Sequence, residues 1–193
     1  MARLYDPPVG PLNRFVDQLR RDRADESIPY VDPDTGGAEA QVLVLFQDPG
    51  SKTRPEQGSG MLSWSNDDPT AECFCELLAN VGIDWKLLVP WNAVPWHTGG
   101  KNPASVLAEG RRTLRDLLQL LPYAVAVLTA GDIAAAQWRM FGTEHAPARL
   151  LRAVHTLHPS GLGLTRGSRQ KRVEGIATME AHLASLSEFV RGS

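Results

Sequence analysis

The sequence predicts an α/β fold in which a parallel sheet of four strands is covered by helices on both faces. Four short apolar runs alternate with helical patterns, and each run ends at polar or turn-forming residues. Such runs are typical of parallel strands buried on both faces, and the alternation gives crossover connections. The chain of 193 residues, 42% of them hydrophobic, is long enough for one buried core.

We expect a single domain over residues 1–193, with an N-terminal helix and loop in 1–40, a motif-bearing core in 41–163 and a C-terminal helix in 164–193. Apolar residues at helical spacing predict an amphipathic helix over 11–23, and Pro and Gly residues predict a loop over 24–38. The expected strands are 41–46, 86–90, 124–129 and 150–156.

Helices are expected between these strands and after the last one. Asp68 and Pro69 are typical of an N-cap followed by the first helical residue, and Gly82 ends this helix. Asn102 and Pro103 open a second capped helix, a third follows Gly131, and the last spans 173–190. The polar, Gly-rich segment 51–68 is a long loop, and such loops are usually functional or disordered.

Composition excludes several classes of function. The two cysteines, Cys73 and Cys75, are too few for an iron–sulfur cluster, and we expect reduced structural thiols. Nothing resembles a signal peptide or a membrane span, so we expect a soluble, cytoplasmic protein. A net charge of -2 does not by itself indicate a nucleic-acid binder, although a local basic patch is compatible with it.

Three predicted strands end in polar residues beside turn-forming ones. These ends read QDPGS at 47–51, WNAVPWH at 91–97 and HPSGLG at 158–163. Because the carboxyl ends of parallel strands meet at one edge of a sheet, Asp48, Asn92 and His158 are expected to converge.

This set of motifs resembles the uracil-DNA glycosylase superfamily, whose best-known branch carries GQDPYH, an Asn after a hydrophobic strand, and HPSPLS. The resemblance covers residues 41–163 and implies a three-layer α/β/α sandwich with a central four-stranded parallel sheet. It also implies a DNA repair enzyme that flips a deaminated base, foremost uracil, out of DNA and hydrolyses its N-glycosidic bond, as a monomer without metal or other cofactor.

The resemblance also assigns roles. Asp48 would stabilise the cationic sugar and orient water, and His158 would donate a hydrogen bond to the leaving base. Asn92 would read the edge of the extruded base, since its amide both donates and accepts. Gln47 would contribute its backbone at the pocket floor. Trp64 would stack on the base, although a buried Trp is more often a core residue.

Contacts with DNA follow from the same motifs. Leu162 matches a leucine that wedges into the base stack, and Ser51 and Ser160 are candidate phosphate contacts. One group of cations, Lys52 and Arg54, follows the first motif, and a second group follows the last motif: Arg166, Arg169, Lys171 and Arg172. Both groups favour a DNA-facing edge, although a solvated helix start would also explain the second group. The cations expected to contact DNA are Lys52, Arg166 and Arg169.

The pattern departs from the best-known branch at three points. Gly50 stands where that branch has a Tyr, which predicts a roomier pocket for thymine, hypoxanthine or other bases unless Trp64 or Trp91 refills it. Phe46 replaces the usual Gly, a change that the sequence does not explain. His97 has no counterpart and no partner ligands, so we expect no metal site.

Two other functions are compatible with these residues. A damaged-DNA-binding module of the same fold would bind the altered base with little or no turnover. An unrelated α/β hydrolase is the other, but the chain lacks G-x-S-x-G and a P-loop.

Overall fold

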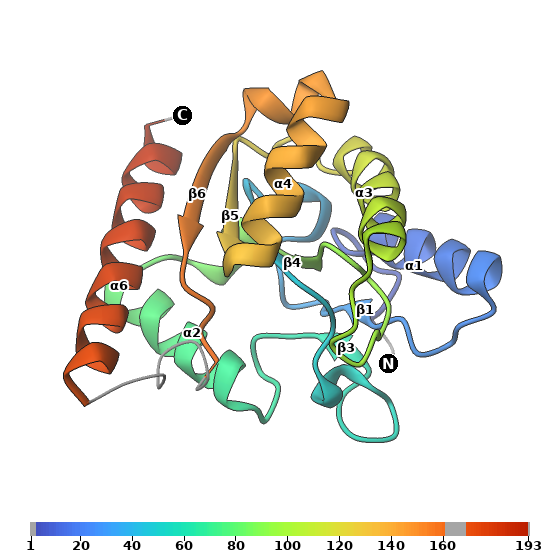
Figure 1. Ribbon diagram of the computed structural model, residues 1–193, viewed down its shortest axis with the longest axis horizontal. Helices are drawn as coiled ribbons and strands as arrows, with labels where there is room; N and C mark the ends of the chain where they lie inside the picture. The colour runs from blue at the N-terminus through green and yellow to red at the C-terminus, as the bar shows by residue number, and fades with distance from the viewer. Residues whose placement is uncertain (1–2, 161–168, 193) are drawn as a thin grey trace.

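The computed structural model describes residues 3–160 and 169–192. Four parallel strands form its central sheet in the order β4-β2-β5-β6 (Figure 1). The four predicted strands and their parallel arrangement are confirmed, with ends shifted by a few residues. The strands are β2 Val42–Phe46, β4 Leu88–Asn92, β5 Ala126–Ala130 and β6 Arg152–Thr156.

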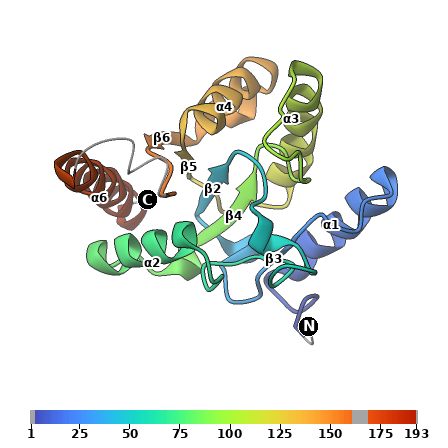
Figure 2. The same cartoon turned by 60° about the horizontal axis from the view of Figure 1, so that its bottom comes forward.

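Helices cover both faces of this sheet, as Figure 2 shows, and the predicted α/β/α sandwich is confirmed. On one face lie α1 Gly10–Arg23, α3 Ala104–Gln119 and α4 Asp132–Glu144. On the other lie α2 Pro69–Val81 and α6 Arg169–Arg191. Within the described ranges, none of these helices is both long and apolar enough to cross a membrane.

Strand β2 shows how the two cores are divided. Leu43 and Leu45 pack in the cluster shared with α1, α3 and α4, whereas Val42 and Val44 pack in the cluster shared with α2 and α6. Successive side chains of a strand point to opposite faces, so Phe46 continues the Val42–Val44 face. The end of β2 therefore presents an aromatic ring on the side of α2.

Two segments predicted as loops contain a second, smaller sheet, which corrects the sequence interpretation. Strands β1 Tyr30–Val31 and β3 Met61–Leu62 pair in parallel. The side chain of Asn13, buried in α1, holds β1 by accepting from Val31 N–H over 2.8 Å and donating to the Val31 carbonyl over 3.0 Å. Strands of two residues have no alternating pattern that a sequence could reveal.

A short 3₁₀ turn accounts for the later start of β4. Trp85–Leu87 forms such a turn, capped by the Asp84 carboxylate, so β4 begins two residues later than predicted. The other 3₁₀ turns in the described part of the chain are Gly37–Glu39, Ser51–Thr53 and Ala146–Leu150.

The predicted boundaries of α2 are confirmed, but the predicted cap of α3 is wrong. Asp68 accepts hydrogen bonds from Thr70 N–H and Ala71 N–H over 2.9 and 3.0 Å, and Gly82 ends α2 with a left-handed φ of 70°. Helix α3 has no side-chain cap. The amide of Asn102 is instead buried, without a hydrogen-bond partner in the described part of the chain.

Gly110 lets α3 approach the loop that follows β4. A methyl group there would overlap the carbonyl oxygen of Ala93. We therefore expect Gly110→Ala to lower the free energy of unfolding by about 1–3 kcal/mol despite a gain in helix propensity of about 1 kcal/mol. Gly142→Ala in α4 is the matched control, because its methyl group would meet only the Arg149 side chain at 3.8 Å. Urea unfolding measures both, and equal stability of the two variants would contradict the expectation.

Candidate active site at the carboxyl edge of the sheet

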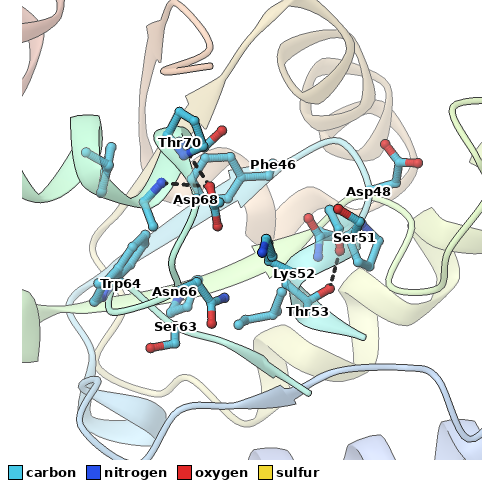
Figure 3. A pocket seen from close by; sticks show the side chains of 18 of the residues that line it. Phe46, Asp48, Ser51, Lys52, Thr53, Ser63, Trp64, Asn66, Asp68 and Thr70 are labelled. Carbon is cyan, nitrogen blue, oxygen red and sulfur yellow. Dashed lines mark hydrogen bonds between the residues drawn. The ribbon is translucent and has the colours of Figure 1, made fainter. Parts of the chain in front are cut away.

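A cavity of about 300 Å³ lies at the carboxyl edge of the sheet, on the side of α2 (Figure 3). Its lining comes from the ends of β2 and β4, the segments 48–53 and 62–66, the start of α2, and the residue that follows β6 by two positions. Asp48, Asn92 and His158 all line it. The three residues that were expected to converge therefore lie around one cavity.

The sheet register explains part of this convergence. Phe46 of β2 is paired with Asn92 of β4, so both side chains leave the sheet on the same face. The ladder continues past the strands, because Ala93 N–H donates to the Phe46 carbonyl over 2.8 Å and Val94 N–H to the Gln47 carbonyl over 3.0 Å. Asn92 is thus fixed beside the turn that carries Asp48.

Asn92 has the features of a residue that binds a ligand. The residue is only 2% exposed, yet its amide nitrogen has no hydrogen-bond partner among the described residues. A buried donor left unpaired costs about 1–3 kcal/mol, so such groups call for a functional explanation. A ligand in the cavity with an acceptor facing Asn92 would supply the missing partner.

His158 is set up as a hydrogen-bond donor. Burial lowers the pKa of its imidazole, an effect that the nearby carboxylates of Asp48 and Asp68 oppose. The backbone N–H of Ser160 donates to Nδ1 over 3.1 Å, so Nδ1 is an acceptor and the proton of the neutral ring lies on Nε2. Neutral His158 can thus donate through Nε2.

Asp48 is half-buried, and one of its oxygens already has a partner. The hydroxyl of Thr98 donates to Oδ2 over 2.6 Å. Sequence reasoning missed Thr98, because a threonine in an irregular segment gives no signal. In Figure 3 Asp48 lies on the opposite side of the view from Trp64, so the two border different parts of the cavity.

The aromatic residues divide between the two faces of the sheet. Trp64 lines the cavity but is 6% exposed and stacks on Phe74 at 4.9 Å, so its stacking on a base stays a prediction. Phe46 also lines the cavity, with its ring edge-to-face with His158 at 5.8 Å.

Trp91 belongs to the opposite core, where it stacks on Phe15 at 5.9 Å. The idea that Trp91 refills the space beside Gly50 is therefore wrong. Strand alternation could have shown this, because Trp91 precedes Asn92 and must point away from the cavity. The same reasoning finds Phe46, which lies two positions after Val44 on the cavity face.

The other predicted site residues differ in position. Gly50, Ser51 and Lys52 line the cavity and are exposed. Gln47 and Ser160 are not among the lining residues, and Arg169 is exposed at the start of α6. Two further predicted DNA contacts, Leu162 and Arg166, lie outside the described residues.

His97 does not line the cavity, and its Nε2 is buried without a hydrogen-bond partner among the described residues. Burial lowers the pKa of this histidine, Arg54 lowers it further, and the carboxylates of Asp25 and Asp48 oppose both. Cys73 and Cys75 are free thiols. Within 3–160 and 169–192, no group of three or more His, Cys, Asp or Glu side chains could hold a metal ion.

No family model and no curated protein matches this sequence. Among solved structures, the chain is similar to wild-type SMUG2 of Pedobacter heparinus, a DNA glycosylase, with 14% identity and a TM-score of 0.52. The similarity covers 98% of this chain and 87% of that one. At this identity the comparison establishes the architecture alone. The chain therefore shares its overall fold with that protein.

Proposed function

We propose that the protein is a DNA glycosylase that flips a deaminated base, foremost uracil, out of DNA and hydrolyses its bond to deoxyribose. One observation carries the proposal: a carboxylate, an amide whose nitrogen has no partner among the described residues, and an imidazole line a single cavity at the carboxyl edge of the sheet. The glycosylase-like fold supports it.

The cavity residues suit the two charges that this reaction creates. The oxygen of a water molecule bonds to the C1′ atom of the sugar while the C1′–N bond breaks, and the electrons of that bond leave with the base. The Asp48 carboxylate would stabilise the positive sugar and orient the water, and Nε2–H of His158 would donate to the negative base oxygen. One proton of the water stays in the new C1′ hydroxyl, and the other passes to the base or to solvent.

Recognition would rest on Asn92, whose amide can both donate to and accept from the edge of an extruded base. We propose DNA with an altered base as the partner, bound by a monomer without a metal or organic cofactor. Ser51 and Lys52, exposed beside the cavity, would contact the phosphate backbone. Leu162, Arg166 and Arg169 remain predicted contacts.

The test incubates the protein with single- and double-stranded oligonucleotides that carry uracil, a G·T mismatch or hypoxanthine. Alkali then cleaves at abasic sites, and chromatography identifies the free base. We expect uracil release with turnover. Tight binding to uracil-containing DNA without release would favour the damaged-DNA-binding module, and neither binding nor release would overturn the proposal.

Gly50 should control which bases enter. Its backbone φ of -74° is open to any residue, and no atom of the described residues beyond its two chain neighbours lies within 4 Å of the place where a side chain would begin. Gly50→Tyr is therefore expected to fold normally and to reduce release of thymine or hypoxanthine at least tenfold more than release of uracil, because clashes reject large ligands first. Rates of release of each base measure this effect. Gly50→Ala is the control for a small side chain, and equal losses for all bases would contradict the expectation.

A further inference from the structure

The segment 93–98, which follows β4, lies against the turn 47–50, which follows β2. Ala93 and Val94 continue the backbone ladder onto β2. Their N–H groups donate to the carbonyls of Phe46 and Gln47. The start of the turn that carries Asp48 is thus held by its neighbour at two successive positions.

Thr98 extends these contacts to the carboxylate itself. Its hydroxyl and Oδ2 of Asp48 are 2.6 Å apart, the length of a hydrogen bond from a hydroxyl to a charged acceptor. Both side chains are half-buried, which limits competition from water. Thr98 is not among the residues that line the cavity, so it reaches the cavity only through Asp48.

A hydrogen bond of this kind restricts a motion that Asp would otherwise have. The terminal torsion of an Asp side chain is broad, so an unbound carboxylate samples many orientations of its two oxygens. With Oδ2 held by Thr98, rotation of the carboxylate is restricted, and the position of Oδ1 is set with it. A reaction that needs a carboxylate at a defined place loses rate when that group rotates freely.

We propose that Thr98 is a positioning residue, which holds the Asp48 carboxylate in the orientation that the reaction needs. This inference rests on the proposed function. It also gives a role to Thr98, which lies just beyond the motif at 91–97.

The first test compares two substitutions in single-turnover release of uracil from duplex DNA. Thr98→Val keeps the shape of the side chain and removes its hydroxyl, and we expect a rate about 10- to 100-fold lower. Thr98→Ser keeps the hydroxyl and should recover most of the rate. Binding of uracil-containing DNA should stay within about threefold for both. Thr143→Val, on the exposed surface of α4, is the control for losing a threonine hydroxyl elsewhere.

The second test places Thr98→Val in the Asp48→Asn background. If Thr98 acts through the carboxylate, the second substitution should add little to the first. A full additional loss of rate in that background would overturn the inference. An unchanged rate in Thr98→Val would also overturn it. So would equal losses of rate in Thr98→Val and Thr98→Ser together with lowered thermal stability of both variants. A wild-type protein that releases no base would instead overturn the proposed function, so the two failures are distinguishable.

Discussion

Asp48→Asn is expected to lower the rate of base release by about 10²- to 10⁴-fold. Asparagine has nearly the same shape, and its oxygen can still accept the hydrogen bond from Thr98. It lacks the negative charge that would stabilise the cationic sugar. Single-turnover assays on uracil-containing duplexes measure the chemical step, and fluorescence anisotropy should show DNA binding within a few-fold of wild type.

Asp67→Asn is the matched control, since Asp67 is exposed, immediately precedes the cavity residue Asp68 and does not line the cavity. We expect this variant to keep the wild-type rate. Comparable losses in both variants would point to a general effect of charge on DNA binding. Full activity of Asp48→Asn would remove Asp48 from the mechanism.

The second large effect is expected for His158→Ala, which should lose about 10²- to 10³-fold in rate. This is the usual cost of removing a donor that stabilises a developing negative charge. His155→Ala, on the exposed side of β6, is the control and should be nearly silent. Comparison of substrates whose leaving bases differ in acidity would sharpen the test, because a better leaving group depends less on the lost donor.

The protonation of His158 predicts the pH dependence of the rate. Burial lowers its pKa below the ordinary value of about 6.5, so the neutral ring should persist at pH 6.5. At lower pH a second proton on Nδ1 would face the N–H of Ser160 and break their hydrogen bond. We expect a rate that is constant down to about pH 6.5 and falls below it, and a rate that rises on acidification through this range would contradict the assignment.

The stability of the fold should change in the same range of pH. The unfolded chain binds a proton on His158 near its ordinary pKa, whereas the folded chain binds it only at lower pH. The unfolded state therefore holds more protons between the two values, and the free energy of unfolding decreases as the pH falls through that window. His158→Ala should show a smaller decrease over the same window in urea unfolding.

The central sheet could be predicted from the sequence because each of its strands is a continuous apolar run. Once Val42–Phe46 and its neighbours are parallel, their carboxyl ends must share an edge, so the meeting of Asp48 and Asn92 follows from topology. The sequence does not predict contacts that depend on the direction of side chains in irregular segments. Thr98 reaches Asp48 across 50 positions, and neither residue lies in a repeating pattern at that point.

Local preference also failed where tertiary contacts decided the outcome. Asn102 before Pro103 has the composition of a helix cap, yet its amide is buried without capping α3. Tyr30–Val31 is too short to be recognised as a strand and exists because Asn13 and β3 supply its hydrogen-bond partners. In both cases the local preference of the residues for a cap or a strand is about 1 kcal/mol, and packing interactions readily exceed this amount.

The small β1–β3 sheet joins the N-terminal helix to one wall of the cavity. Asn13 fastens Val31, Val31 pairs with Leu62, and Leu62 and Ser63 border the space where a base would enter. A shortened protein that starts at residue 41 would retain all three recognisable motifs and still lack the support for that wall. A protein built from the motif region alone would therefore lack a part of the molecule on which the shape of the cavity depends.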